Sequence, residues 1–70
     1  MTQTNLLKAK MAFLNLTIAS VSKALGLSYL QTHKKIHNKA QFTQRELKIL
    51  WQLLKLTEKE FLEIFFNKAS

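Results

Sequence analysis

The sequence predicts a single all-α domain on three observations. The chain of 70 residues has one glycine and no proline, which favours helices over a fold with many turns. It has no cysteine, so neither a disulfide nor a thiolate metal site can hold it together. A hydrophobic residue followed directly by Ser or Thr recurs at four places, each before a stretch of helical periodicity, and this pattern is typical of helix starts. Together these features indicate five helices.

The first helix is expected over residues 4–14. Leucines and Met11 form an apolar stripe there, with lysines beside it. Asn15 follows and is a plausible helix stop, because asparagine tolerates the left-handed backbone conformation.

The central stretch, residues 17–36, is expected to form two short helices joined at Gly26. Thr17 is a good N-cap for the first of them. Gly26 lies where that helix must stop in a left-handed conformation, and Ser28 then caps the second helix with Gln31 as its reciprocal partner. Two short helices joined by a three-residue turn that contains glycine are typical of the DNA-binding helix-turn-helix.

The last two helices are expected over residues 44–54 and 58–67. The final one is apolar over more than half its circumference and includes Phe65 and Phe66 in succession. Because both rings cannot face so small a core, we expect a weak homodimer through this helix.

Capping boxes support three of these helix starts. The expected pairs are Ser28 with Gln31, Thr43 with Glu46, and Thr57 with Glu60. Residues 37–42 form the loop before the fourth helix, with Asn38 as its left-handed residue.

Charge is distributed unevenly along the chain. Lys and Arg number 11 against four acidic residues, a net charge of +7. Every acidic residue lies in the last third, at Glu46, Glu58, Glu60 and Glu63. Residues 1–45 therefore carry only positive formal charges, and this segment contains the central stretch. A basic, acid-free segment indicates a polyanionic partner.

Composition argues against an enzyme and against a small-molecule substrate. There is no Cys, no Asp and no glycine-rich phosphate loop, and no carboxylate is placed to orient a Ser–His pair. We therefore expect no catalytic residues and no cofactor.

His33 and His37 share a helix face, and their spacing can hold a metal. No third ligand is visible nearby, so we favour no metal site, with His33 facing DNA and His37 ending the helix, where the dipole favours a cation. No apolar run approaches the length of a membrane span, and the polar N-terminal sequence leads us to expect an intracellular protein.

The helix after Gly26 carries the candidate DNA-reading side chains, because the N-terminal part of such a helix reaches the base edges. Lys34 can donate to guanine, and His33 can donate to a base or a phosphate. Tyr29 can reach a phosphate with its hydroxyl or contact a thymine methyl group, whereas Leu30 can only contact such a methyl group. Backbone phosphates are candidates for Lys35, Lys39 and the Ser28 amide at the helix N-terminus. Tyr29 and Leu30 have a second possible role, which is packing against the protein or a partner.

Four segments resemble the lambda-repressor-like superfamily, and within it the short Cro-like regulators of phages and integrated elements of Gram-positive bacteria. They are KALGLS at 23–28, KKIHNK at 34–39, FTQRE at 42–46 and EIFF at 63–66. The resemblance implies a five-helix domain that binds double-stranded operator DNA as a homodimer and represses transcription in the bacterial or phage-infected cytoplasm, at the nucleoid. It places Tyr29, Leu30 and Lys34 at base-contacting positions, and Thr17 and Lys39 at phosphate positions.

The sequence departs from that family's pattern at Phe13, Leu14, Ile18, Ser22 and Thr32. The apolar departures support an alternative function as a protein-interaction module, similar to an antirepressor. In that alternative Phe13, Ile18, Tyr29 and Leu30 form an apolar docking surface. A weaker alternative is a basic surface for anionic membranes, which the regularly capped helices argue against.

Overall fold

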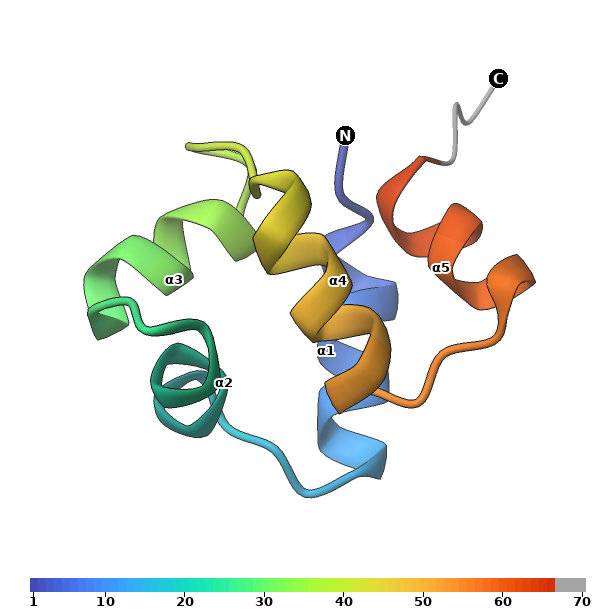
Figure 1. Cartoon of the computed structure of the whole chain (residues 1–70), viewed down its shortest axis with the longest axis horizontal. Coiled ribbons are helices and arrows are strands. Elements are labelled where there is room, and N and C mark those ends of the chain that lie inside the picture. Colours follow the sequence, from blue (N-terminus) through green and yellow to red (C-terminus); the bar gives the residue numbers. More distant parts are fainter. Residues whose placement is uncertain (67–70) are drawn as a thin grey trace.

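The computed structural model describes residues 1–66, which form five helices and no strand. The helices are α1 (Thr4–Phe13), α2 (Ile18–Leu25), α3 (Tyr29–Ile36), α4 (Gln44–Leu53) and α5 (Glu58–Phe65) (Figure 1). The all-α prediction with five helices is therefore confirmed. Helices α1 and α4 end one residue earlier than predicted, and the predicted end of α5 at Asn67 lies outside the described residues.

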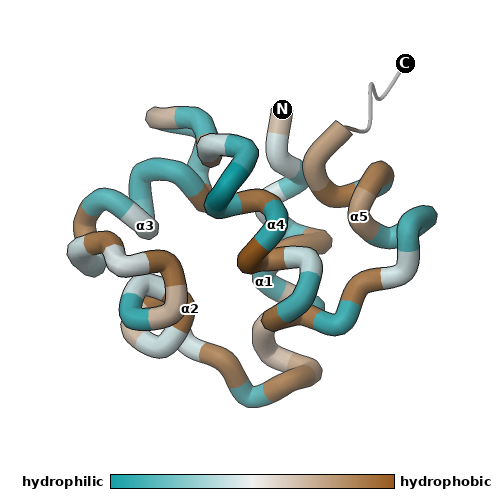
Figure 2. Tube along the Cα trace, in the orientation of Figure 1, coloured by the Kyte–Doolittle hydropathy of each residue, from teal (hydrophilic) through white to brown (hydrophobic). Residues whose placement is uncertain are grey.

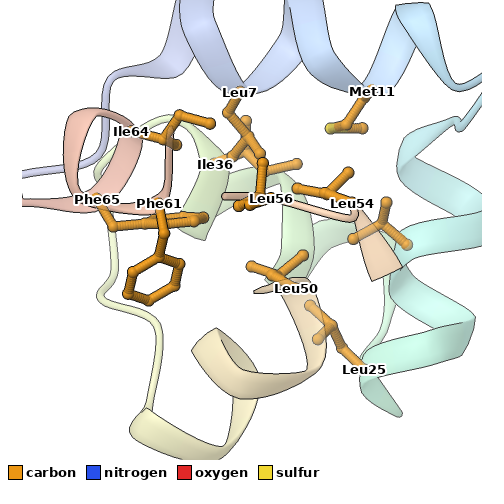
Figure 3. Close-up of a cluster of buried hydrophobic side chains, with 11 residues drawn as sticks. Leu7, Met11, Leu25, Ile36, Leu50, Leu54, Leu56, Phe61, Ile64 and Phe65 are labelled. Atoms are coloured by element: carbon orange, nitrogen blue, oxygen red, sulfur yellow. The ribbon is translucent and has the colours of Figure 1, made fainter. Parts of the chain in front are cut away.

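One apolar core joins all five helices. Helix α2 packs against α3 and α4, whereas α1 packs against α5, and α4 occupies the centre of the view in Figure 1. The buried hydrophobic side chains come from every helix and from the α4–α5 turn (Figure 3). They are Leu7, Met11, Val21, Leu25, Ile36, Leu50, Leu54, Leu56, Phe61, Ile64 and Phe65.

Three of the four connections use the same short turn. Each begins with a left-handed residue: Asn15 (φ 59°), Gly26 (φ 72°) or Lys55 (φ 52°). A leucine follows, and its amide donates to the carbonyl five residues earlier, as from Leu27 to Ser22 at 3.0 Å. A Thr or Ser then caps the next helix. The predicted left-handed conformations of Asn15 and Gly26 are confirmed, while that of Lys55 was not predicted.

Capping boxes begin α2, α3, α4 and α5. The three predicted boxes are confirmed. A fourth joins Thr17 to Ser20, where the Thr17 amide donates to Ser20 Oγ at 2.8 Å. It was missed because serine replaces the usual Gln or Glu at that position.

Two hydroxyl groups are buried in the core without remaining unpaired. Thr32 Oγ1 donates to the Ser28 carbonyl at 3.0 Å, and Ser22 Oγ donates to the Ile18 carbonyl at 2.6 Å. These bonds satisfy the hydroxyls within their own helices, so the polar residues are accommodated between α2 and α3. Among residues 1–66, no helix is long and apolar enough to cross a membrane.

Candidate nucleic-acid interface

The candidate interface is built on α2, the turn at Gly26 and α3. The left-handed Gly26 ends α2, and Ser28 begins α3 two residues later. A side chain at Gly26 would meet no atom within 4 Å, so its backbone conformation rather than a close contact calls for glycine. This turn lets α3 pack across α2 with one face outward.

Helix α3 divides cleanly into an inner and an outer face. Thr32 and Ile36, four residues apart, are fully buried. On the opposite side Leu30 is 61% exposed and Lys34 is also exposed, while Tyr29, at the N-terminal end of the helix, is 57% exposed. Figure 2 shows hydrophilic residues along most of α3. Leu30 and Lys34 therefore point outward, and Tyr29 is more than half exposed, with its ring against that of His33.

Three aromatic rings form a column along α3. Tyr29 stacks on His33 with centroids 6.3 Å apart, and His33 stacks on His37 at 4.2 Å. His37 Nδ1 lies 2.9 Å from the His33 carbonyl oxygen, and His37 is the C-cap residue of α3. The column fixes the orientation of His33 beside Lys34. No group of three potential metal ligands occurs among the described residues.

Lys35 does not face outward with Lys34. Its ammonium donates to Glu46 Oε1 at 2.6 Å, and both side chains are largely buried between α3 and α4. Burial raises the pKa of Glu46, but hydrogen bonds from Lys35 and the Thr43 amide, together with the Lys35 charge, outweigh burial and leave that pKa below its ordinary value. We therefore correct the prediction for Lys35, whose charge is neutralised inside the protein, and remove it from the interface.

The two cap residues, Thr17 and Ser28, are occupied by their own helices. The Ser28 amide donates to Gln31 Oε1 at 3.0 Å, so the prediction that this amide is free for a phosphate is corrected. The Ser28 hydroxyl accepts from the Gln31 amide at 3.1 Å, which leaves its proton available. Thr17 Oγ1 accepts from the Ser20 amide at 3.1 Å and also donates to Ser20 Oγ at 3.3 Å, and both Thr17 and Ser28 are exposed.

Lys39 extends the basic face beyond the end of α3. It follows the left-handed Asn38 (φ 62°), and its amide donates to the Lys34 carbonyl at 2.8 Å. Its side chain is exposed and forms no ion pair with any residue in the described part of the chain. The predicted left-handed conformation of Asn38 is confirmed.

The four residues of the alternative apolar surface do not form one patch. Ile18 is half-buried and packs on the core. Phe13 is exposed and lines a hollow of about 400 Å³ between α1 and α5, which includes Leu6 and Glu63. Only Tyr29 and Leu30 remain together on α3, so this hypothesis loses half of its proposed surface.

Two features of this region escaped sequence reasoning. The Lys35–Glu46 ion pair joins residues on different helices, and no local spacing marks it. The side chain of Asn38, identified only as a turn residue, bonds to the segment before α1. One signal for the bonding of Asn38 was available in the sequence. Glycine would suffice at a left-handed turn position, so a polar residue there indicates that its side chain has a partner.

Comparisons with protein-family models, with curated proteins and with solved structures find no significant match to this chain.

Proposed function

We propose that the protein is a non-enzymatic, sequence-specific regulator that binds double-stranded DNA with α3 in the major groove. The carrying observation is the outer face of α3, where Leu30 and Lys34 lie one helical turn apart and both are exposed. This face belongs to residues 1–45, which contain no acidic residue. The two short helices and their glycine turn also support the resemblance to Cro-like repressors.

The outward residues divide into two roles. Lys34 donates to guanine O6 and N7, while Tyr29 and Leu30 contact thymine methyl groups at the N-terminal part of α3. His33, held by its stacking on His37, donates to a neighbouring base or phosphate. Phosphates are bound by Lys39 and by the hydroxyls of Thr17 and Ser28, which position the helix without reading sequence.

A mobility-shift series over salt concentration, after selection of duplexes from a random pool, tests the proposal. We expect the logarithm of the binding constant to fall with the logarithm of salt, by about 0.9 for each phosphate neutralised. Absence of binding to any duplex at low salt would rule the function out.

A comparison of Lys34→Ala with Lys39→Ala tests the division of roles. We expect Lys34→Ala to relax sequence preference, whereas Lys39→Ala should weaken binding to all sequences alike. Equal behaviour of the two variants would contradict the assignment.

The proposal includes a weak homodimer through α5. Leu62 in α5 and Phe66, the C-cap residue directly after it, are 49% and 53% exposed and lie four positions apart in the sequence. Phe65 instead is buried against Phe42 and Phe61. Two such stripes brought together would remove the exposed apolar surface from water.

Sedimentation at high micromolar concentration tests the pairing. A dimer that is lost on Leu62→Ser supports it, with Leu30→Ser on the exposed face of α3 as the control in the absence of DNA. A monomer at every concentration, with and without DNA, would contradict it.

The protein-interaction alternative retains only Tyr29 and Leu30, exposed and apolar on α3. Partner binding that is insensitive to salt, with no duplex bound, would favour this alternative over DNA.

A further inference from the structure

The segment before α1 lies against the end of α3. The Thr2 amide donates to Asn38 Oδ1 at 2.9 Å, and Asn38 Nδ2 donates back to the Thr2 carbonyl at 2.8 Å. The Asn38 side chain thus pairs with both polar groups of one residue, as a neighbouring β-strand would. This is a two-point attachment that fixes direction as well as distance.

A third bond reaches the last turn of α3 from Thr4, the first residue of α1. Thr4 Oγ1 donates to the Ile36 carbonyl at 2.6 Å. The last four carbonyls of a helix have no partner within it, and Thr4 supplies one from outside. The end of α3 is therefore held by residues more than 30 positions away in sequence.

A fourth bond connects this segment to α5. The Gln3 amide donates to the Ile64 carbonyl at 2.6 Å. Figure 1 shows the N-terminal segment beside α5. Residues 2–4, which we call the arm, therefore bond to α5 on one side and to the end of α3 on the other.

Asparagine at position 38 is informative because glycine would adopt φ 62° without strain. Asn15 has nearly the same backbone conformation (φ 59°) at the end of α1, but its side chain makes no hydrogen bond within the described residues. The Asn38 amide group thus does more than end a helix, and Asn15 provides a matched position without that contact.

We propose that Asn38 and Thr4 are positioning residues, which use the arm to set the angle of α3 and the place of Lys39 relative to α5. The inference rests on the proposed DNA-binding function, since α3 is the reading helix there. Because α5 is also the proposed dimer helix, the arm couples the spacing of two reading helices to their angle in the groove. Discrimination between sequences depends on that angle more than general phosphate attraction does.

The test uses two variants. Asn38→Gly keeps the left-handed backbone and removes the clamp, by which we mean the two hydrogen bonds between the Asn38 side chain and Thr2. Thr4→Val removes the hydroxyl donor at nearly constant side-chain shape. Asn15→Gly is the control. The ratio of affinities for the selected duplex and a scrambled one should fall about threefold to tenfold in the first two variants. It should not change in Asn15→Gly, and Thr4→Ser should restore the parent ratio.

Hydrogen exchange of the Gln3 amide provides a readout that needs no DNA. Asn38→Gly should accelerate it, because release of the arm exposes the bond from Gln3 to Ile64, while Asn15→Gly should not. An unchanged exchange rate, or an unchanged affinity ratio in chains that bind DNA, would overturn the inference. If the parent chain binds no duplex, the proposed function fails, and exchange alone still decides whether the clamp exists.

Discussion

The pairs α2–α3 and α4–α5 are joined by the same turn but present opposite surfaces. Gly26 and Lys55 are left-handed, each is followed by a leucine, and each leucine precedes a capping Ser or Thr. Helix α3 has two lysines and no acid, whereas α5 has three glutamates and one lysine. The outer row on α3 is Leu30 and Lys34, and on α5 it is Leu62 and Phe66.

The comparison shows that the shared turn determines where one helix ends and the next begins, but not which side chains the second helix exposes. Cap, left-handed residue and leucine are local features that fix where one helix ends and the next begins. The outward residues lie at positions that these features leave free. We therefore propose DNA as the partner of the exposed face of α3 and a second subunit as the partner of the apolar residues at α5, although the two turns are alike.

The largest expected effect concerns two ion pairs, one between the two helix pairs and the other between α5 and α1. Lys35–Glu46 is buried and joins α3 to α4, while Lys10–Glu60 is more exposed and joins α1 to α5. We expect Glu46→Ala to lower the free energy of unfolding by about 3 kcal/mol, because it leaves the Lys35 ammonium buried without a partner. Glu60→Ala should lower it much less. Urea unfolding at pH 7 measures both, and equal losses would contradict the distinction.

The same carboxylates predict a loss of stability in acid. The Thr57 amide and Lys10 hold the pKa of Glu60 below its ordinary value of 4.5, and the pKa of Glu46 is also lowered. A carboxylate with a lowered pKa in the folded state stabilises the fold above its unfolded pKa and loses that contribution as pH falls through the folded value. Stability should therefore be steady near neutral pH and decline below about pH 4.5. In Glu46→Ala the acid-side decline should be shallower, which thermal melts from pH 2 to 7 can test.

The next effect is a difference in DNA affinity between charge removal on α3 and charge removal on α5. Lys34 on α3 and Lys59 on α5 are both exposed, and replacing either with alanine removes one positive charge. We expect Lys34→Ala to weaken binding to the selected duplex by about 2 kcal/mol, or roughly thirtyfold, because it removes a base contact. Lys59→Ala should change affinity by less than about threefold, as distant charges are screened. Equal losses in a titration at 0.15 M salt would indicate general attraction instead of reading by α3.

Local signals in the sequence were sufficient for most of the fold. Helix starts followed from Ser or Thr caps, and stops at Asn15, Gly26 and Asn38 followed from residues that tolerate left-handed backbone. Lys55 was missed because lysine has no such preference, and the leucine and cap that follow it were the only signal. The physical reason for these successes is that caps and turns depend on residues close in sequence.

The candidate site was less accessible to the same reasoning. Helical spacing predicted that Leu30 and Lys34 are exposed, and in the structure they are, with Thr32 and Ile36 buried on the opposite face. Lys35 was misassigned because its partner Glu46 lies on another helix, and pairing across helices leaves no local pattern. The arm's bonds to Asn38 were invisible for the same reason.

The smallest expected effect comes from substitutions at the two left-handed turn residues, Gly26 and Lys55. Gly26→Ala should destabilise the protein by about 1 kcal/mol, because a residue with a Cβ is strained at φ 72° even where no atom lies nearby. Lys55→Gly, at φ 52°, should instead stabilise it by up to about 1 kcal/mol, since it relieves the strain that lysine bears. Chemical unfolding of both variants provides the measurement. If the turns are alike in structure, the shifts should be opposite in sign and similar in size. A loss at Gly26 of several kcal/mol would show that the α2–α3 turn is constrained by more than its own backbone.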